Sequence, residues 1–236
     1  KAADAYQKIL TDSASLGVIL EYPGTVAPAR TVAITSGASK PAGKVVAAMI
    51  GAGNFAKMTM GPALAKTQAR LKYVAELAGA AAARHVARKY GFENATTDAE
   101  AVWNDPDLNT VFIATGHASH AALVCKALES GKHAFVEKPL AMNVEEVSRI
   151  IRAAEAHPQL QVMVGFNRRF SPHVERIKQL LAGRSEPLAM HFACNAGIIP
   201  PGAWVHDPEA GGGRIVGEAC HFLDLLAYVA GSPIAT

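Results

Sequence analysis

A buried strand that runs directly into a glycine-rich turn limits what this chain can fold into more than any other feature. Residues 45–50 form a continuous apolar run, as a strand covered on both faces requires. Gly51-x-Gly53-x-x-Ala56 follows and opens a predicted helix, whose free N–H groups favour an anion. Gly51 permits the tight turn, Gly53 lets the backbone approach a pyrophosphate, and Ala56 allows close helix–strand packing. We therefore predict a dinucleotide site, rather than an empty turn, that includes Gly51, Gly53, Asn54, Phe55 and Ala56.

Strands and helices keep alternating after this motif. The first helix should kink or restart at Pro62, because this residue has no N–H for the carbonyl of Met58. Alternation at this spacing predicts an α/β fold with a parallel, doubly wound Rossmann sheet. The predicted strands are 71–75, 111–115, 132–136 and 161–166, and the predicted helices are 80–90, 121–128 and one that Asn143 opens, with Glu146 three residues later.

The pattern changes after residue 165. A helix at 172–181 and an alternating strand at 188–195 precede a loop rich in Gly and Pro and a helix at 215–229. This predicts the beginning of a second, open-sheet α/β domain, too short to be a whole domain. The predicted domains are therefore 1–43, a remnant of a preceding domain plus a linker; 44–164, the dinucleotide-binding domain; and 165–236, a partial substrate and oligomerisation domain.

Composition excludes several classes of protein. Of 236 residues, 50% are hydrophobic and 18% charged, which indicates a globular chain. A net charge of +3, with scattered Lys and Arg, predicts no nucleic-acid partner, and no apolar run is long enough to predict a membrane span. Cys125, Cys194 and Cys220 are far apart in apolar segments. We expect reduced core thiols and a cytoplasmic location.

An acidic residue about 20 positions after the glycine motif should hold the ribose 2′-OH of the dinucleotide. Glu76 lies 20 residues past Ala56 at a predicted strand end, and Leu77 competes for that place if the register slips by one. Glu76 as an ordinary exposed charge is the alternative. The cofactor is therefore predicted to be NAD or NADP, with NAD favoured.

A second set of polar residues follows the strand at 111–115. Because ligands bind beyond the carboxyl ends of such strands, Thr115 and Gly116 should border the nicotinamide. His117 and His120 are three residues apart, but no Cys or carboxylate accompanies them at metal-ligand spacing, so no metal is expected. We assign His120 to the start of a helix near the cofactor.

Lys138 ends the strand at 132–136, within Glu137-Lys138-Pro139. At that position its ammonium would face the same crevice as the glycine turn and could hydrogen-bond a substrate hydroxyl and relay its proton. Pro139 restricts the lysine backbone and so fixes how the side chain projects. Taken alone, a surface lysine in a loop would be the better interpretation.

Four motifs that follow one another along the chain favour a functional role for Lys138 over a surface lysine. They occupy residues 52–56, 131–141 with Glu-Lys-Pro, 164–172 with Asn-Arg-Arg-Phe, and 211–224 with a triple glycine and His221. In this order, residues 44–236 resemble the Gfo/Idh/MocA family, which includes glucose–fructose oxidoreductase and inositol dehydrogenase. The resemblance implies a Rossmann domain with a nicotinamide cofactor, beside Glu137 and Lys138, and a second domain that forms the substrate wall and often the oligomer interface.

The resemblance also assigns the catalytic groups. It implies that Lys138 contacts cofactor and substrate and that His221 is the acid–base group, paired in the family with an aspartate four residues earlier. Here that position is Gly217, and the adjacent residue is Glu218. Glu218 and His221 are three apart and can share a helix face, so we expect Glu218 to orient the imidazole. A core-facing helix histidine is the alternative.

Further residues are candidates for the substrate. Asn167 and Arg168 follow a strand end, and Trp204 and His206 lie in the loop before the triple glycine. Trp204 could stack on a sugar ring or equally cap a core.

The first residues carry a weaker resemblance. A helix at 2–10, a strand at 16–22 and Glu-Tyr-Pro resemble the tail of a zinc-type medium-chain alcohol dehydrogenase domain, and some proteins fuse such a domain ahead of a Gfo/Idh/MocA domain. An ordinary N-terminal helix and strand would give the same sequence pattern.

Together these features predict an NAD(P)-dependent oxidoreductase. Hydride would pass between nicotinamide and a carbinol carbon of a sugar, polyol or sugar nucleotide. A homo-oligomer is expected for the full-length protein. Two alternatives remain open, an NAD-dependent glycosidase of the same family and a dinucleotide-sensing regulator without catalysis.

Overall fold

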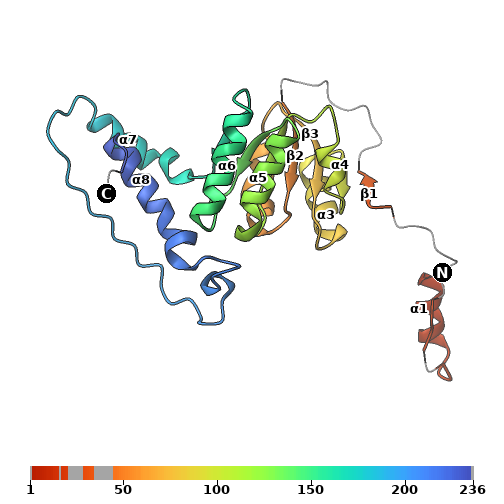
Figure 1. Cartoon of the computed structure of the whole chain (residues 1–236). Helices are drawn as coiled ribbons and strands as arrows, with labels where there is room; N and C mark the ends of the chain where they lie inside the picture. The colour runs from red at the N-terminus through yellow and green to blue at the C-terminus, as the bar shows by residue number, and fades with distance from the viewer. Residues whose placement is uncertain (1, 16, 21–28, 35–44, 235–236) are drawn as a thin grey trace.

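A seven-stranded sheet forms the centre of the computed structural model, which describes residues 2–15, 17–20, 29–34 and 45–234 (Figure 1). The strand order is β1-β4-β3-β2-β5-β6-β7. β1 is antiparallel to β4, and all other neighbouring pairs are parallel. The strands are β1 Thr31–Ala33, β2 Val46–Ile50, β3 Arg70–Ala75, β4 Asn94–Thr96, β5 Thr110–Ile113, β6 His133–Val136 and β7 Val162–Val164. The predicted α/β class and parallel sheet are confirmed.

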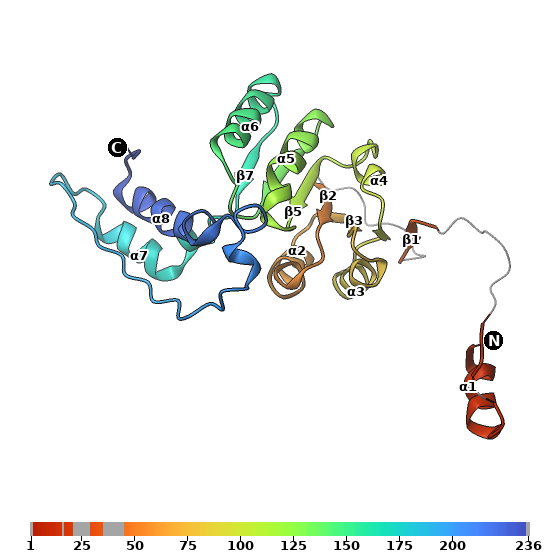
Figure 2. The ribbon, with the colours of Figure 1, turned by 60° about the horizontal axis from the view of Figure 1, so that its bottom comes forward.

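Helices cover both faces of this sheet (Figure 2). One face carries α2 and α3, and the other carries α4, α5 and α6. The helices are α1 Ala2–Thr11, α2 Gly61–Ala65, α3 Ala80–Tyr90, α4 Glu100–Trp103, α5 His120–Glu129, α6 Val144–Ala156, α7 Pro172–Leu180 and α8 Cys220–Ala230. Shorter helical turns are η1 Ala56–Met60, η2 His117–Ser119, η3 Asn167–Phe170, η4 Trp204–His206 and η5 Ile215–Ala219. None of the described helices is long and apolar enough to cross a membrane.

β2 shows why the apolar run folds as a central strand. All five of its residues are buried, and they alternate between the two layers. Val46, Ala48 and Ile50 pack beneath α5 and α6, whereas Ala47 and Met49 pack beneath α2 and α3. A strand buried on both faces has no solvent-facing side, so its sequence is continuously apolar instead of alternating between apolar and polar residues.

The chain reverses direction across the sheet beside β2. It moves outward from β2 through β3 to β4, and then returns to place β5 on the other side of β2. A crevice opens beyond the carboxyl ends of two strands at such a switch point. The sheet therefore brings the turn after β2 next to the turn after β5, and the turn after β6 follows.

The helix after β2 is distorted where Pro62 was expected to disturb it. Residues 56–60 form a π-helical turn, in which the Gly61 N–H donates to the Ala56 carbonyl five residues earlier. Pro62 then lies in the first turn of α2, where its missing N–H costs little. The predicted kink or restart is thus present as a π turn.

Two predictions for the N-terminal residues are wrong where the structure describes them. Gly17–Leu20 belong to no strand, and residues 16, 21 and 22 of the predicted strand lie outside the described residues. Within the predicted linker, of which 24–28 and 35–43 also lie outside them, Thr31–Ala33 form β1 and pair with β4. The sequence indicates neither β1 nor β4, because three-residue strands with polar members give almost no alternation to detect.

The predicted strand at 188–195 is also absent, and most of its side chains are exposed. A strand needs a neighbour to pair its backbone groups, and no described strand lies beside this segment. Cys194, expected in the core, is exposed for the same reason. The segment runs as a long loop from α7 to the glycine-rich turn (Figure 1). Phe192 in this loop stacks on Phe222 of α8, at 4.7 Å between ring centroids.

A charged pair fastens α8 to the end of the Rossmann domain. Arg169 donates two hydrogen bonds to the carboxylate of Asp224, one of them at 2.7 Å. The Asp224 side chain is only 8% exposed, and this bond raises the pKa of Arg169. A two-pronged pair fixes orientation as well as distance. It therefore holds α8, with His221 one turn earlier, beside the residues that follow β7.

Candidate functional site

The turn after β2 needs glycine at its first position. Gly51 has φ +99°, and a Cβ there would overlap the Ala114 carbonyl at the end of β5. Gly53 differs, because nothing lies within 4 Å of the Cβ it lacks. One glycine is required by the fold, and the other leaves open space above the start of the helix. That space suits a pyrophosphate, which the N–H groups of this turn can bind.

Glu76 lies beside the same turn. Its Oε2 accepts the Ala52 N–H at 2.9 Å and its Oε1 accepts the Ala78 N–H at 3.1 Å. The carboxylate is thus fixed between the glycine turn and the end of β3, whereas the competing Leu77 is 68% exposed. A fixed negative charge here favours a ribose hydroxyl over a 2′-phosphate.

His120 joins two strand ends. It is fully buried, with Nδ1 2.7 Å from the Pro139 carbonyl and Nε2 3.2 Å from the Thr115 carbonyl. Burial lowers its pKa. The ring therefore fixes the turn that carries Lys138 against the end of β5, at the start of α5, where the sequence predicted it.

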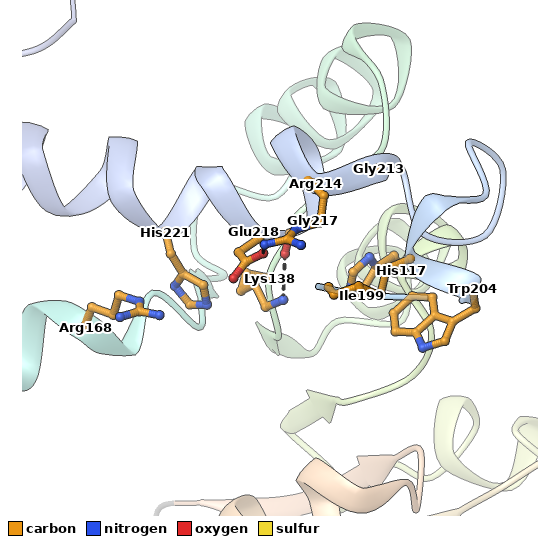
Figure 3. Close-up of a pocket in the computed structure, with 11 residues that line it drawn as sticks. His117, Lys138, Arg168, Ile199, Trp204, Gly213, Arg214, Gly217, Glu218 and His221 are labelled. Atoms are coloured by element: carbon orange, nitrogen blue, oxygen red, sulfur yellow. Dashed lines mark hydrogen bonds and ion pairs between the residues drawn. The ribbon is translucent and has the colours of Figure 1, made fainter. Parts of the chain in front are cut away.

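Lys138 bridges the Rossmann domain and the residues after it. Its ammonium donates a hydrogen bond to the Gly217 carbonyl at 2.8 Å (Figure 3). No carboxylate of the described residues lies within ion-pair distance of it. The ammonium keeps two further N–H donors, so it can bind a second oxygen while it holds this contact.

Two cavities meet at this lysine. The Thr115 cavity, of about 420 Å³, is lined by Phe55, Ala114, Thr115, Gly116, His120, Glu137 and Asn167. The Arg214 cavity, of about 370 Å³, is lined by Arg168, Ile199, Val205, Gly213, Arg214, Gly217 and Glu218. His117, Lys138, Trp204 and His221 line both cavities. These four side chains therefore stand where a group bound at the strand ends would meet a group bound beneath α8.

A third cavity, also of about 420 Å³, lies along the α2 side of β5–β7. Its walls are almost wholly apolar, including Phe112, Phe135 and Met163. It offers no cluster of donors for phosphates and no acid–base group besides Glu137. Burial raises the pKa of that carboxyl. The polar chemistry of this part of the molecule is therefore concentrated in the two cavities at Lys138.

His221 projects from the first turn of α8 into both cavities. Burial lowers its pKa, and the nearby charges of Lys138 and Arg168 lower it further against the opposing effect of Asp224 and Glu218. The imidazole is therefore neutral at neutral pH and able to accept a proton. Its Nδ1 is buried without a hydrogen-bond partner among the described residues.

The expected contact between Glu218 and His221 is absent from the described structure. Glu218 Oε2 instead pairs with Arg214 Nη2 at 2.6 Å (Figure 3). The π-helical turn at 215–219 changes the helical register, and Glu218 points back along the chain to the residue four before it. Orientation of His221 by Glu218 is thus not what this geometry provides.

Gly217 stands where the family pattern has an aspartate, and the structure gives a physical reason. A Cβ at this position would lie 3.1 Å from the Gly211 carbonyl oxygen and 3.2 Å from the His117 ring. His117 is only 8% exposed, its Nδ1 is 2.9 Å from the same carbonyl oxygen, and its ring meets Trp204 edge-on. His117 therefore fills the space that a side chain at 217 would enter.

The remaining predicted residues divide into two groups. Asn167 lines the Thr115 cavity, Arg168 lines the Arg214 cavity, and Trp204 lines both. His206 is exposed and lines neither, so the structure does not bring it to the site. His117 and Arg214 also line the site, although no prediction from the sequence included them as cofactor or substrate residues. The position of His117 just after a strand end is a signal that could have indicated it.

Comparison with known proteins identifies the family of the chain. The Gfo/Idh/MocA family, an oxidoreductase family with an NAD-binding Rossmann fold, matches residues 45–166. The chain belongs to this family. The resemblance carried by the four motifs is thereby confirmed.

Individual relatives extend the match. Levoglucosan dehydrogenase of Pseudarthrobacter phenanthrenivorans is 33% identical over 156 residues, which are 63% of this chain and 40% of that protein. The structure of a levoglucosan dehydrogenase in complex with NADH and levoglucosan has a TM-score of 0.65 at 28% identity, covering 79% of this chain and 54% of that one. An NAD-binding protein from Listeria innocua has a TM-score of 0.63 at 26% identity, covering 79% and 55%. The chain spans about half the length of the curated relatives it matches.

Proposed function

We propose that the protein is an NAD(P)-dependent dehydrogenase that acts on a CH–OH group of a sugar, polyol or sugar nucleotide. One observation carries the proposal: Lys138 and His221 line both the cavity at the strand ends and the cavity beneath α8. A nicotinamide at the strand ends would accept a hydride from a carbinol carbon beneath α8. Family membership and the NADH complex of a relative support this assignment.

The chain's own residues supply the proton chemistry in this proposal. Neutral His221 accepts the hydroxyl proton, because its lowered pKa keeps the imidazole unprotonated at neutral pH. Lys138 holds the substrate oxygen with one of its remaining N–H donors while it stays bonded to Gly217. Glu218 stays paired with Arg214 and takes no part in the transfer.

The domains divide this work. Residues 44–164 would bind the cofactor through Gly51, Gly53, Asn54, Phe55 and Ala56, and residues 165–236 would supply part of the substrate wall. A cytoplasmic location and a homo-oligomer of the full-length protein go with the proposal. Light scattering on the purified full-length protein measures the oligomer directly.

The proposal is tested with full-length protein in two steps. In the first step, calorimetric titration with NADH should show saturable binding at one site per chain. A panel of sugars, polyols and sugar nucleotides with NAD⁺ or NADP⁺ should then give substrate-dependent absorbance of the reduced nicotinamide. Released aglycone without reduced nicotinamide would instead identify a glycosidase. Failure of NADH to bind would end the proposal.

Glu76 should set the preference between the two dinucleotides. We expect the wild type to prefer NAD⁺, because the fixed carboxylate repels a 2′-phosphate. Glu76→Gln keeps an acceptor for the Ala52 N–H and removes the charge, so the preference should move toward NADP⁺ by roughly 10-fold. The ratio of kcat/KM values for the two cofactors measures this shift. Glu145→Gln, on the exposed face of α6, is the matched control and should leave the ratio unchanged.

A further inference from the structure

The Arg214 cavity carries an excess of positive charge. Lys138, Arg168 and Arg214 line it with one acidic side chain, that of Glu218. Glu218 is already paired with Arg214. Lys138 and Arg168 therefore face the cavity as two cations without a counter-charge.

Arg168 has no acidic partner in the part of the chain that the structure describes. Its neighbour Arg169 takes the carboxylate of Asp224, so the two adjacent arginines have different surroundings. The Arg168 guanidinium lies over the Phe222 ring, 4.9 Å from its centroid, and Phe222 is itself stacked on Phe192. The guanidinium is thus held over one ring, and none of its N–H groups donates to another described residue.

The direction of this side chain matters as much as its charge. Figure 3 shows the guanidinium end of Arg168 directed toward His221, at the edge of the cavity opposite Trp204. The positive field also reaches His221: burial lowers the pKa of this imidazole, and the charges of Lys138 and Arg168 lower it further. A ligand that brings a negative charge to this corner would offset that field beside the reacting hydroxyl.

We infer that the substrate of the proposed dehydrogenase is an anionic carbohydrate whose carboxylate or phosphate is bound by Arg168. The inference rests on the proposed function and narrows its substrate class. A planar guanidinium binds either anion through two parallel hydrogen bonds, with a geometry that a neutral hydroxyl cannot match. A cavity of about 370 Å³ is within the size range of sites for small molecules.

The test measures binding of matched sugars to full-length protein saturated with NADH, by calorimetry. Hexuronates, hexose 6-phosphates and the parent hexoses form the panel, and the first two arms distinguish a carboxylate from a phosphate. At least one of the two kinds of anionic sugar should bind roughly 10- to 100-fold more tightly than its parent hexose, as expected for hydrogen bonds to a charged group. Arg168→Gln should remove most of this advantage, so that the anionic sugar and its parent hexose bind with similar affinity.

Two further variants sharpen the result. Arg168→Lys keeps the charge without the planar fork and should restore part of the lost affinity. Arg152→Gln removes an exposed arginine from α6 and should change nothing. Anions that bind no better than neutral sugars, or an Arg168→Gln variant that binds anions as well as the wild type, would overturn the inference. Loss of NADH binding itself would instead count against the proposed function.

Discussion

Lys138→Met should lower kcat for hydride transfer by about 10²- to 10⁴-fold, the usual contribution of a positioned proton-handling group. Methionine keeps the length of the apolar stem but removes every N–H donor. The substrate oxygen would then lose its hydrogen bond at the point where the two cavities meet. NADH affinity should change much less, because the phosphates bind at the glycine turn. Steady-state absorbance assays of nicotinamide reduction at saturating substrate measure the fall in kcat.

A matched control separates this effect from a loss of folding. Lys126→Met removes an exposed lysine from α5 and should leave kcat unchanged. Lys138→Met also loses its bond to the Gly217 carbonyl, so thermal unfolding of both variants should be recorded. If Lys138→Met turned over substrate as fast as Lys126→Met, Lys138 would have no part in the chemistry.

Alanine at the two glycines of the turn should produce two different failures. Gly53→Ala should leave folding intact, because its Cβ meets open space, and should weaken NADH binding by roughly 10- to 100-fold through overlap with the pyrophosphate. Gly51→Ala should instead destabilise the protein by about 2–5 kcal/mol, which combines a left-handed backbone with overlap on Ala114.

Calorimetric titration with NADH and denaturant unfolding, applied to both variants, distinguish the two outcomes. Each variant serves as the other's control, since the same methyl group is added two residues apart. Equal loss of stability in both variants would mean that the turn is only structural. Unchanged NADH affinity in a folded Gly53→Ala protein would place the pyrophosphate elsewhere.

The centre of the fold could be predicted because its sequence signals are local. β2 is a run of apolar residues with a glycine turn after it, and α3 was predicted at its observed bounds because an alanine-rich stretch ends at Gly91. Asn143 caps α6 by accepting the Glu146 N–H, as the spacing of these two residues indicated. In each case the residues that form the element also carry its boundary signal.

The missed elements depend on partners far away in the sequence. β1 and β4 are three residues long; β1 pairs only with β4, with Thr31 opposite Thr96, and β4 lies between β1 and β3. The alternating residues at 188–195 have the reverse problem, since their pattern suits a strand but no described strand pairs with them. Pairing is a tertiary property that local periodicity does not contain.

The sequence indicated which residues lie together at the site, but not which of them pair with each other. Strand ends and motif order indicated Lys138, Asn167, Arg168 and His221, and the structure places them around the two cavities. Helical spacing suggested that Glu218 meets His221, but a π-helical turn directs it to Arg214. The crowding of Gly217 by His117 joins residues 100 positions apart, so no local pattern could reveal it. The roles assigned to these residues stay predictions.

The positions of the two tryptophans give the protein a built-in optical reporter. Trp103, the last residue of α4, is 6% exposed in the core, whereas Trp204 is 55% exposed and lines both cavities. Light emitted by Trp204 would fall within the absorption of a bound reduced nicotinamide, and the loss of emission would follow cofactor binding in real time. Trp103 lines neither cavity and adds emission of its own to the signal. A Trp103→Phe protein would therefore turn the natural fluorescence of this chain into a single-site signal.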